Sequence, residues 1–164
     1  VNGNDLGSAI KNKYTASAEL MNLKDNIEQL ILAYKEARDD SSINQLLLIP
    51  CVILDFLCIH PVNDGNGRLS RLLTTLLLYK NGYMIGKYIS IEKEIANTKE
   101  EYYKALELSD RYWRDESNDP KEFIKYMLKI ILACYKELDK RLELINNDGI
   151  KSSSYDIVKK YVLC

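Results

Sequence analysis

The amino-acid sequence predicts an all-α protein, built as an antiparallel bundle of helices. Most of the chain places apolar residues three or four positions apart, which is the spacing of one face of an α-helix. Capping residues, glycine and proline separate these periodic stretches, as they do at helix ends. One stretch, residues 43–59, is apolar nearly all round, which predicts a helix in the centre of the bundle.

The composition is typical of a soluble globular protein. Its 164 residues fit one domain, for which about 100–200 residues are usual. With 23 basic and 24 acidic residues the net charge is −1, which gives no overall electrostatic case for binding nucleic acid or a membrane surface.

Cysteine usage and hydropathy predict a cytoplasmic location. The four cysteines contain no C-x-x-C pair, and the single histidine cannot complete a zinc site with them. We therefore expect free thiols in a reducing compartment. No signal peptide is visible, and the apolar run 46–59 is shorter than the roughly 20 residues that span a bilayer.

The first helix is predicted over residues 17–38, with Thr15 or Ser17 as its N-cap. Residues 39–42 form the turn into the next helix. The apolar stripe of the first helix follows helical spacing and consists of Leu20, Leu23, Ile27, Leu30, Ile31 and Tyr34.

The second helix, residues 43–59, contains two unusual residues. Pro50 predicts a kink or a delayed start, because its ring clashes with the preceding turn and it has no N–H to donate. Asp55 lies among apolar neighbours. It is open to interpretation as a second catalytic carboxylate, but we favour a hydrogen-bonded or cavity-facing carboxylate.

Shorter elements follow in the middle of the chain. A third helix over residues 68–81 is expected to end at Gly82 in the left-handed conformation. After a connector, Ser90 opens a short helix. The pattern Thr98-x-x-Glu101 then predicts a capping box for the next helix.

The last long helix is predicted to start at Asp119, with Pro120 at its first position, and to run to about Asn146. Residues 151–164 are interpreted as a further helix, and as the start of another domain. The stripe of the long helix is interpreted as core and consists of Phe123, Met127, Ile131, Tyr135, Leu138 and Leu142.

The residues that carry chemistry are concentrated at 60–71, between the second and third helices. Pro61 ends the preceding helix, and the turn-forming residues 63–67 lead into a new helix. The first N–H groups of a helix lack partners inside it and carry partial positive charge. Gly65 and Gly67 let the backbone approach a ligand closely, so we expect an anion-binding nest here.

Charged residues around this loop favour a phosphate ligand. Arg68 and Arg71 share one face of the new helix, although cations are unfavourable at a helix N-terminus. An anionic ligand would explain that local conflict. Asp64 is an oxygen ligand suited to a Mg²⁺ ion shared with phosphates. His60 is the only histidine, the side chain best suited to accept a proton near neutral pH.

This stretch closely resembles the motif of the Fic family, His-Pro-Phe-x-Asp/Glu-Gly-Asn-Gly-Arg-x-x-Arg. The match is ungapped, and its one departure is Val62 in place of the usual Phe, a smaller buried anchor with the same role. The resemblance extends from about Tyr14 to Tyr135. It includes a Tyr-Tyr-x-x-Leu segment that begins at Tyr102.

The resemblance implies the all-α Fic fold, in a domain of residues 1–150 whose helical core spans about 17–146. It implies a short β-hairpin flap at about residues 1–16, which would hold target residues by strand addition. In some Fic proteins a winged helix follows. Residues 151–164 are interpreted as the start of such a unit, which would be this protein's one route to nucleic acid.

The activity that the resemblance implies is transfer of AMP from ATP to a Tyr, Ser or Thr hydroxyl of a target protein, with release of pyrophosphate. His60 would remove the proton from that hydroxyl, and Asp64 would hold Mg²⁺. The loop backbone and the Asn66 side chain would bind the α- and β-phosphates, and the two arginines the β- and γ-phosphates. The implied ATP-binding residues are Asp64, Gly65, Asn66, Gly67, Arg68, Arg71, Tyr102 and Tyr103.

Several alternatives stay open at the level of sequence. Tyr102 and Tyr103 would either contact the base and sugar of the nucleotide or pack in the core. The same site would also suit transfer of UMP, phosphocholine or a phosphoryl group, or nucleotide sensing without turnover. Self-modification is a further expectation, because the chain has 12 tyrosines.

Regulation is expected to come from elsewhere. Many Fic proteins carry an inhibitory helix with the pattern Ser/Thr-x-x-x-Glu-Gly/Asn, whose glutamate pairs with the second arginine of the motif. Thr15-x-x-x-Glu19 is followed by Leu20 and does not fit. The inhibitory helix is therefore expected outside this chain, on a partner, or not at all.

Overall fold

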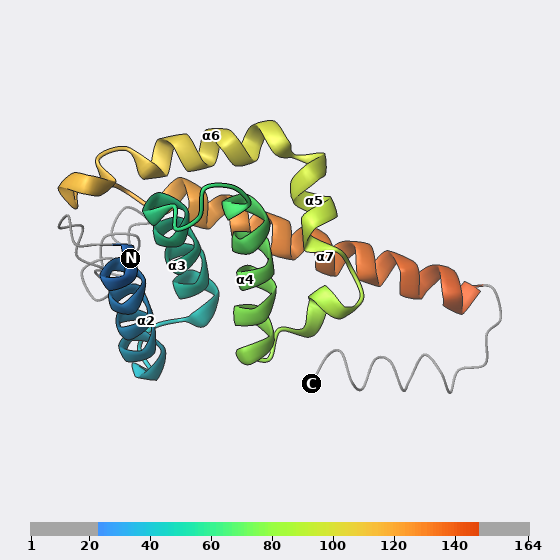
Figure 1. The fold of residues 1–164 in the computed structure, drawn as a ribbon. Helices are drawn as coiled ribbons and strands as arrows, with labels where there is room; N and C mark the ends of the chain where they lie inside the picture. The colour runs from blue at the N-terminus through green and yellow to red at the C-terminus, as the bar shows by residue number, and fades with distance from the viewer. Residues whose placement is uncertain (1–22, 148–164) are drawn as a thin grey trace.

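The computed structural model describes residues 23–147, and within that range the chain is helical with no strands (Figure 1). This confirms the predicted all-α fold. The predicted flap, the start of the first helix and the predicted final helix lie outside the described residues. The elements are α2 Leu23–Asp39, α3 Gln45–Ile59, α4 Asn66–Lys80, the 3-10 turn η1 Met84–Lys87, α5 Ile91–Asn97, α6 Lys99–Asp110, the 3-10 turn η2 Trp113–Asp115 and α7 Lys121–Asn147.

Helix α3 lies at the centre of the bundle, as predicted. It packs against α2, α4, α6 and α7, and Figure 1 shows α3 between α2 and α4, with α6 crossing one end. The seven consecutive residues from Leu48 to Leu54 are all buried. A helix that is apolar on every side can be stable only where other helices cover every side.

The start of α3 corrects one prediction. Pro50 does not mark a delayed start, because the helix begins at Gln45 and continues through it. Asn44 caps the helix upstream, where its side-chain oxygen accepts a hydrogen bond from the Leu46 N–H at 2.9 Å. That cap satisfies one of the donors that a helix N-terminus leaves unpaired.

Helix α4 ends as predicted, in a left-handed glycine. Gly82 has φ +84°. The Tyr83 N–H donates to the Leu78 carbonyl at 2.9 Å, and the Gly82 N–H donates to the Tyr79 carbonyl at 3.1 Å. These two bonds are the Schellman pattern, in which a residue with positive φ lets the chain turn back on the last carbonyls.

Two predicted N-caps near the middle of the chain have different outcomes. Ser90 caps α5, and its hydroxyl accepts from the Lys93 N–H at 3.2 Å. The capping box at Thr98 is wrong. The Thr98 hydroxyl lies 3.0 Å from the Glu94 carbonyl and 2.9 Å from the Tyr126 hydroxyl, and it makes no cap bond to α6. Because α5 ends at the same residue, this side chain serves the preceding helix and the core.

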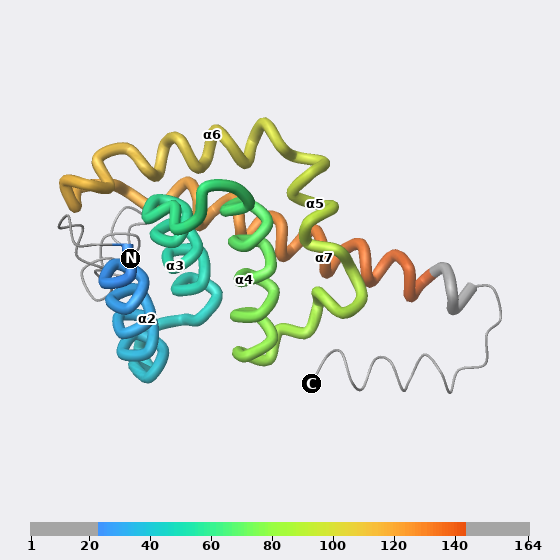
Figure 2. Tube along the Cα trace, in the orientation of Figure 1, coloured from blue at the N-terminus to red at the C-terminus, as the bar shows by residue number. Residues whose placement is uncertain are grey.

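Helix α7 is the longest element and covers the back of the bundle. Asp119 accepts from the Lys121 N–H at 3.0 Å, as expected of the predicted start. The buried face of α7 includes Phe123, Met127 and Cys134, and it packs against α3, α5 and α6. The coloured trace in Figure 2 shows α7 continuing past the other helices. Within residues 23–147, no helix combines the length and the apolar character needed to cross a membrane.

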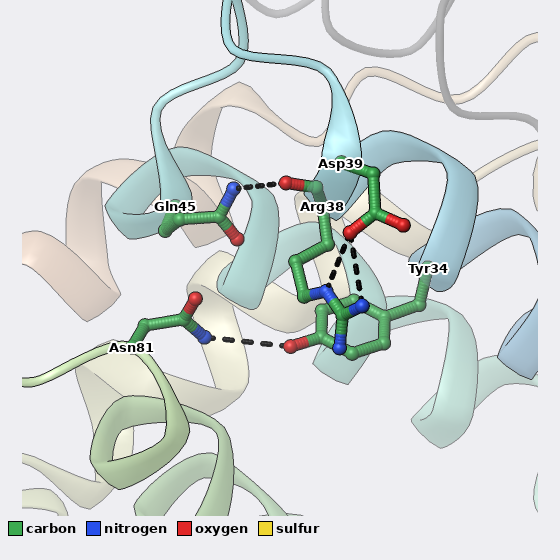
Figure 3. A network of polar contacts seen from close by, with 5 residues as sticks. All are labelled: Tyr34, Arg38, Asp39, Gln45 and Asn81. Atoms are coloured by element: carbon green, nitrogen blue, oxygen red, sulfur yellow. Dashed lines mark hydrogen bonds and ion pairs between the residues drawn. The ribbon is translucent and has the colours of Figure 1, made fainter.

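A small polar network ties the end of α2 to the hairpin of α3 and α4 (Figure 3). Gln45 donates to the Arg38 carbonyl at 3.2 Å, and Asn81 donates to the Tyr34 hydroxyl at 3.4 Å. The Arg38–Asp39 ion pair in the same picture is solvent-exposed, so it contributes little. The Asn81–Tyr34 contact joins residues 47 positions apart and helps to hold α2 against the end of α4.

Two leucines on α4 provide a test of this packing. Leu78 is 0% exposed and Leu72 is 68% exposed. We expect Leu78→Ala to lower the free energy of unfolding by about 2–5 kcal/mol, because it leaves a cavity, and Leu72→Ala to change it by less than about 0.5 kcal/mol. Urea denaturation followed by circular dichroism measures both. Equal effects from the two substitutions would contradict this arrangement of α4.

Candidate functional site

The candidate site is the loop that connects α3 to α4, at one end of the bundle (Figure 2). His60 is the C-cap of α3, with φ 54° and ψ 57°, and its N–H donates to the Phe56 carbonyl at 3.2 Å. A left-handed conformation is costly for a residue other than glycine, and it turns the chain away from the helix axis. The His60 side chain is thereby exposed at the end of a buried helix.

Helix α4 begins at Asn66, and Gly65 is its N-cap, with φ +93° and no side-chain cap bond. Since no side chain caps this end, the first N–H groups of a 15-residue helix point at the loop. The partial positive charge there favours an anion. Gly67 is also closely packed, because a Cβ there would lie 3.3 Å from Nη1 of Arg71. The structure therefore brings the predicted loop residues together at one helix start.

The two arginines of the loop each face a carboxylate. Arg68 lies 3.6 Å from Asp64, and both side chains are highly exposed, at 72% and 95%. This pair is worth little in water. Arg71 is less exposed, at 25%, and its Nη2 lies 2.9 Å from Oε1 of Glu92 on α5. An anion that binds Arg71 through the same nitrogens must therefore displace Glu92.

A cavity of about 360 Å³ opens beside Arg71, between α4 and α5. Its lining includes Thr75, Lys87, Ser90 and Glu92. The cavity is open space beside the Arg71–Glu92 ion pair. The Arg71 side chain therefore borders both the loop, at Gly67, and this cavity.

Tyr102 and Tyr103, predicted as a pair, differ in burial, although their rings contact each other edge to face with centroids 5.4 Å apart. Tyr102 is 7% exposed and makes edge-to-face contacts with Phe123 and Tyr126, which supports the core-packing interpretation. Burial raises the pKa of its phenol, while a hydrogen bond with Ser70 of α4 lowers it. Tyr103 is 55% exposed and lies on the outer side of α6.

Asp55 is a hydrogen-bonded carboxylate, as favoured from the sequence. The indole Nε1–H of Trp113 donates to Asp55 Oδ1 at 2.6 Å. This bond ties η2 to α3 near the turn that carries His60. Beside it lies a cavity of about 460 Å³, lined in part by Cys58, Asp110 and Trp113. Burial and the nearby Glu107 raise the pKa of the Asp110 carboxyl.

The described residues include no group of three or more His, Cys, Asp or Glu side chains that could hold a metal ion. Asp64 is an exposed single carboxylate on the loop. Mg²⁺ commonly binds one or two carboxylates together with substrate phosphates and water. Asp64 therefore fits a Mg²⁺ ion that arrives with a polyphosphate, and does not fit a metal held by protein ligands alone.

Comparison with known proteins supports the motif. The family model of the Fic/DOC family matches residues 4–78, which include the whole loop and most of α4. A Fido domain-containing protein of Dictyostelium discoideum is 30% identical over 115 residues, which are 70% of this chain and 76% of that protein. The chain belongs to the Fic/DOC family. Members of this family generally transfer nucleotide or phosphate groups onto proteins.

Two contacts of this Fic/DOC site were not predictable from local sequence. Glu92 meets Arg71 from 21 positions along the chain, and Trp113 meets Asp55 from 58 positions along it. Neither pair has a spacing that a helix or turn would bring together. Only the packing of α5 and η2 against the α3–α4 hairpin makes these contacts.

The Trp113–Asp55 bond can be tested through stability. We expect Trp113→Phe to lower the free energy of unfolding by about 1–3 kcal/mol, because it removes a hydrogen bond to a charged group and leaves the carboxylate less well satisfied. Tyr112→Phe is the matched control, since Tyr112 is adjacent and 69% exposed. Thermal and urea unfolding measure both variants. A Trp113→Phe protein as stable as this control would contradict a structural role for the bond.

Proposed function

We propose that this Fic/DOC protein is an adenylyltransferase, which moves AMP from ATP to a Tyr, Ser or Thr hydroxyl of a target protein. One observation supports this above the others. An exposed histidine, His60, lies at the end of a buried helix beside the uncapped N-terminus of α4. In this proposal the exposed imidazole is the proton acceptor, and the helix N-terminus beside it is the site for phosphates.

In the proposed reaction His60 accepts the proton of the target hydroxyl. The hydroxyl oxygen then forms a bond to the α-phosphorus of ATP, and the bond from that phosphorus to the bridging oxygen breaks. Pyrophosphate leaves with the bonding electrons, and AMP stays on the target. Catalysis of this kind consists of positioning, proton removal and charge neutralisation.

The residues of the loop divide these tasks. The N–H groups at the start of α4 would bind phosphate oxygens, and Asp64 would hold Mg²⁺, which neutralises phosphate charge when it is bound. Arg68 and Arg71 would contact the β- and γ-phosphates. To do so Arg68 must leave an exposed and weak ion pair, whereas Arg71 must leave Glu92.

The reaction can be tested by intact-protein mass spectrometry after incubation with Mg²⁺ and each nucleoside triphosphate in turn. We expect the mass of one AMP to be added, on this protein or on an added target, and His60→Ala to abolish the addition because no base remains. ATP binding by His60→Ala, measured by calorimetry, is the control and should be retained. Addition of UMP or of a phosphoryl group in place of AMP would show that the protein transfers a different group. Equal labelling of His60→Ala and the parent protein would refute the role of His60.

The Arg71–Glu92 ion pair makes a second prediction. We expect Glu92→Gln to bind ATP about 3- to 10-fold more tightly, because the γ-phosphate no longer competes with a carboxylate for Arg71. AMP, which lacks the β- and γ-phosphates, should bind both proteins equally. Glu94→Gln removes the same charge from the same helix and should leave ATP affinity within about twofold. Equal ATP affinity for the Glu92 and Glu94 variants would exclude competition at Arg71.

A further inference from the structure

We propose that the Asn66 side chain is a positioning residue, which holds the loop before α4 in shape, and is not itself a phosphate ligand. The resemblance drawn from the sequence assigns this side chain to the α- and β-phosphates. The structure instead places its two polar atoms against the backbone of the loop. Only the kinetic part of the test below rests on the proposed function.

The Asn66 amide pairs with both backbone groups of one residue. Its Oδ1 accepts from the Val62 N–H at 3.1 Å, and its Nδ2 donates to the Val62 carbonyl at 2.5 Å. The pair imitates the two-bond contact between peptide groups in an antiparallel ladder. Asn66 is 4% exposed, so little of the side chain remains for a ligand to touch. We call these two bonds the Asn66 clasp.

The clasp restrains the chain segment that follows His60 and leads to α4. On its other side His60 is held to α3, because its N–H donates to the Phe56 carbonyl. Val62 is two residues later, and the clasp joins it to the first residue of α4. His60 therefore lies between two anchors, one on each of two rigid helices. This restrains the distance from the His60 backbone to the N–H groups at the start of α4, and so the region that its side chain can reach.

Among the residues that the structure describes, the other contacts of the loop restrain it less strongly. Val62, expected from the motif to be a buried anchor, is only half-buried, so its two backbone bonds to Asn66 add to the restraint at this position. The Asp64–Arg68 ion pair is exposed and 3.6 Å long. Such a pair is worth little in water. A buried amide that forms two hydrogen bonds is the stronger restraint.

Hydrogen exchange of the Val62 amide in the ligand-free protein tests the clasp directly. We expect Asn66→Ala to exchange this amide about 5- to 10-fold faster than the parent protein, since one hydrogen bond is lost there. Asn81→Ala is the matched control, because Asn81 also bonds the backbone of α4, at Leu77, but at the far end of the helix. It should leave the Val62 amide within about twofold of the parent.

Asn66→Asp is the second variant, in case Asn66→Ala fails to fold. It keeps an oxygen for the Val62 N–H but cannot donate to the Val62 carbonyl, so its exchange should be faster than the parent's. Amides of the buried part of α3 report any global loss of stability and are used to correct for it. Val62 exchange that is unchanged in the variants that fold would overturn the proposal.

The kinetic part separates positioning from ligand binding. If the parent protein shows transfer activity, Asn66→Ala should lower kcat by about 10²-fold, because a misplaced His60 removes the proton of the target hydroxyl less efficiently. It should leave KM for ATP within about threefold, since the arginines and helix N–H groups still bind the nucleotide. A rise in KM with kcat unchanged would overturn the proposal. If no transfer occurs in the parent protein, the proposed function fails while the exchange result still decides the clasp.

Discussion

The burial of the middle of α3, from Leu48 to Leu54, is the constraint on which the rest of the structure depends. Helices on every side are needed to cover a helix with no polar face, and α2, α4, α6 and α7 supply that cover. The middle of α3 is therefore held in place by the bundle, and its half-buried ends continue from that fixed segment. Its C-terminal end carries His60, so the packing of the core directly fixes where the one exposed histidine of the loop lies.

The loop combines two features that lower stability locally. His60 adopts a left-handed conformation, and two arginines follow the uncapped start of α4. A backbone strain and an electrostatic conflict at one place are typical of a site shaped for a ligand rather than for stability. In the protein alone, carboxylates from Asp64 and Glu92 lie against the arginines. An anionic ligand would take over the same role.

The sequence predicted the fold better than the contacts within the site. Helix ends followed from local chemistry at Gly82, Ser90 and Asp119, because capping depends on residues within one turn. Local reasoning failed at Thr98, whose hydroxyl bonds Tyr126 of a distant helix instead of α6. The motif located His60 and the residues around it. The motif could not show which side chains form hydrogen bonds or ion pairs with the polar groups of the loop, because tertiary packing decides those contacts.

Asn66 shows why motif residues need a structure before they are given roles. An asparagine beside two glycines suits both a turn and a phosphate site, and one-dimensional spacing cannot separate the two. In the structure its amide faces the backbone of Val62. A side chain held there is 4% exposed and leaves little surface for a ligand to touch. Under the proposed function, phosphate recognition by this loop would depend on the backbone N–H groups at the start of α4, which this side chain would position, and on Arg68 and Arg71 leaving their carboxylate partners.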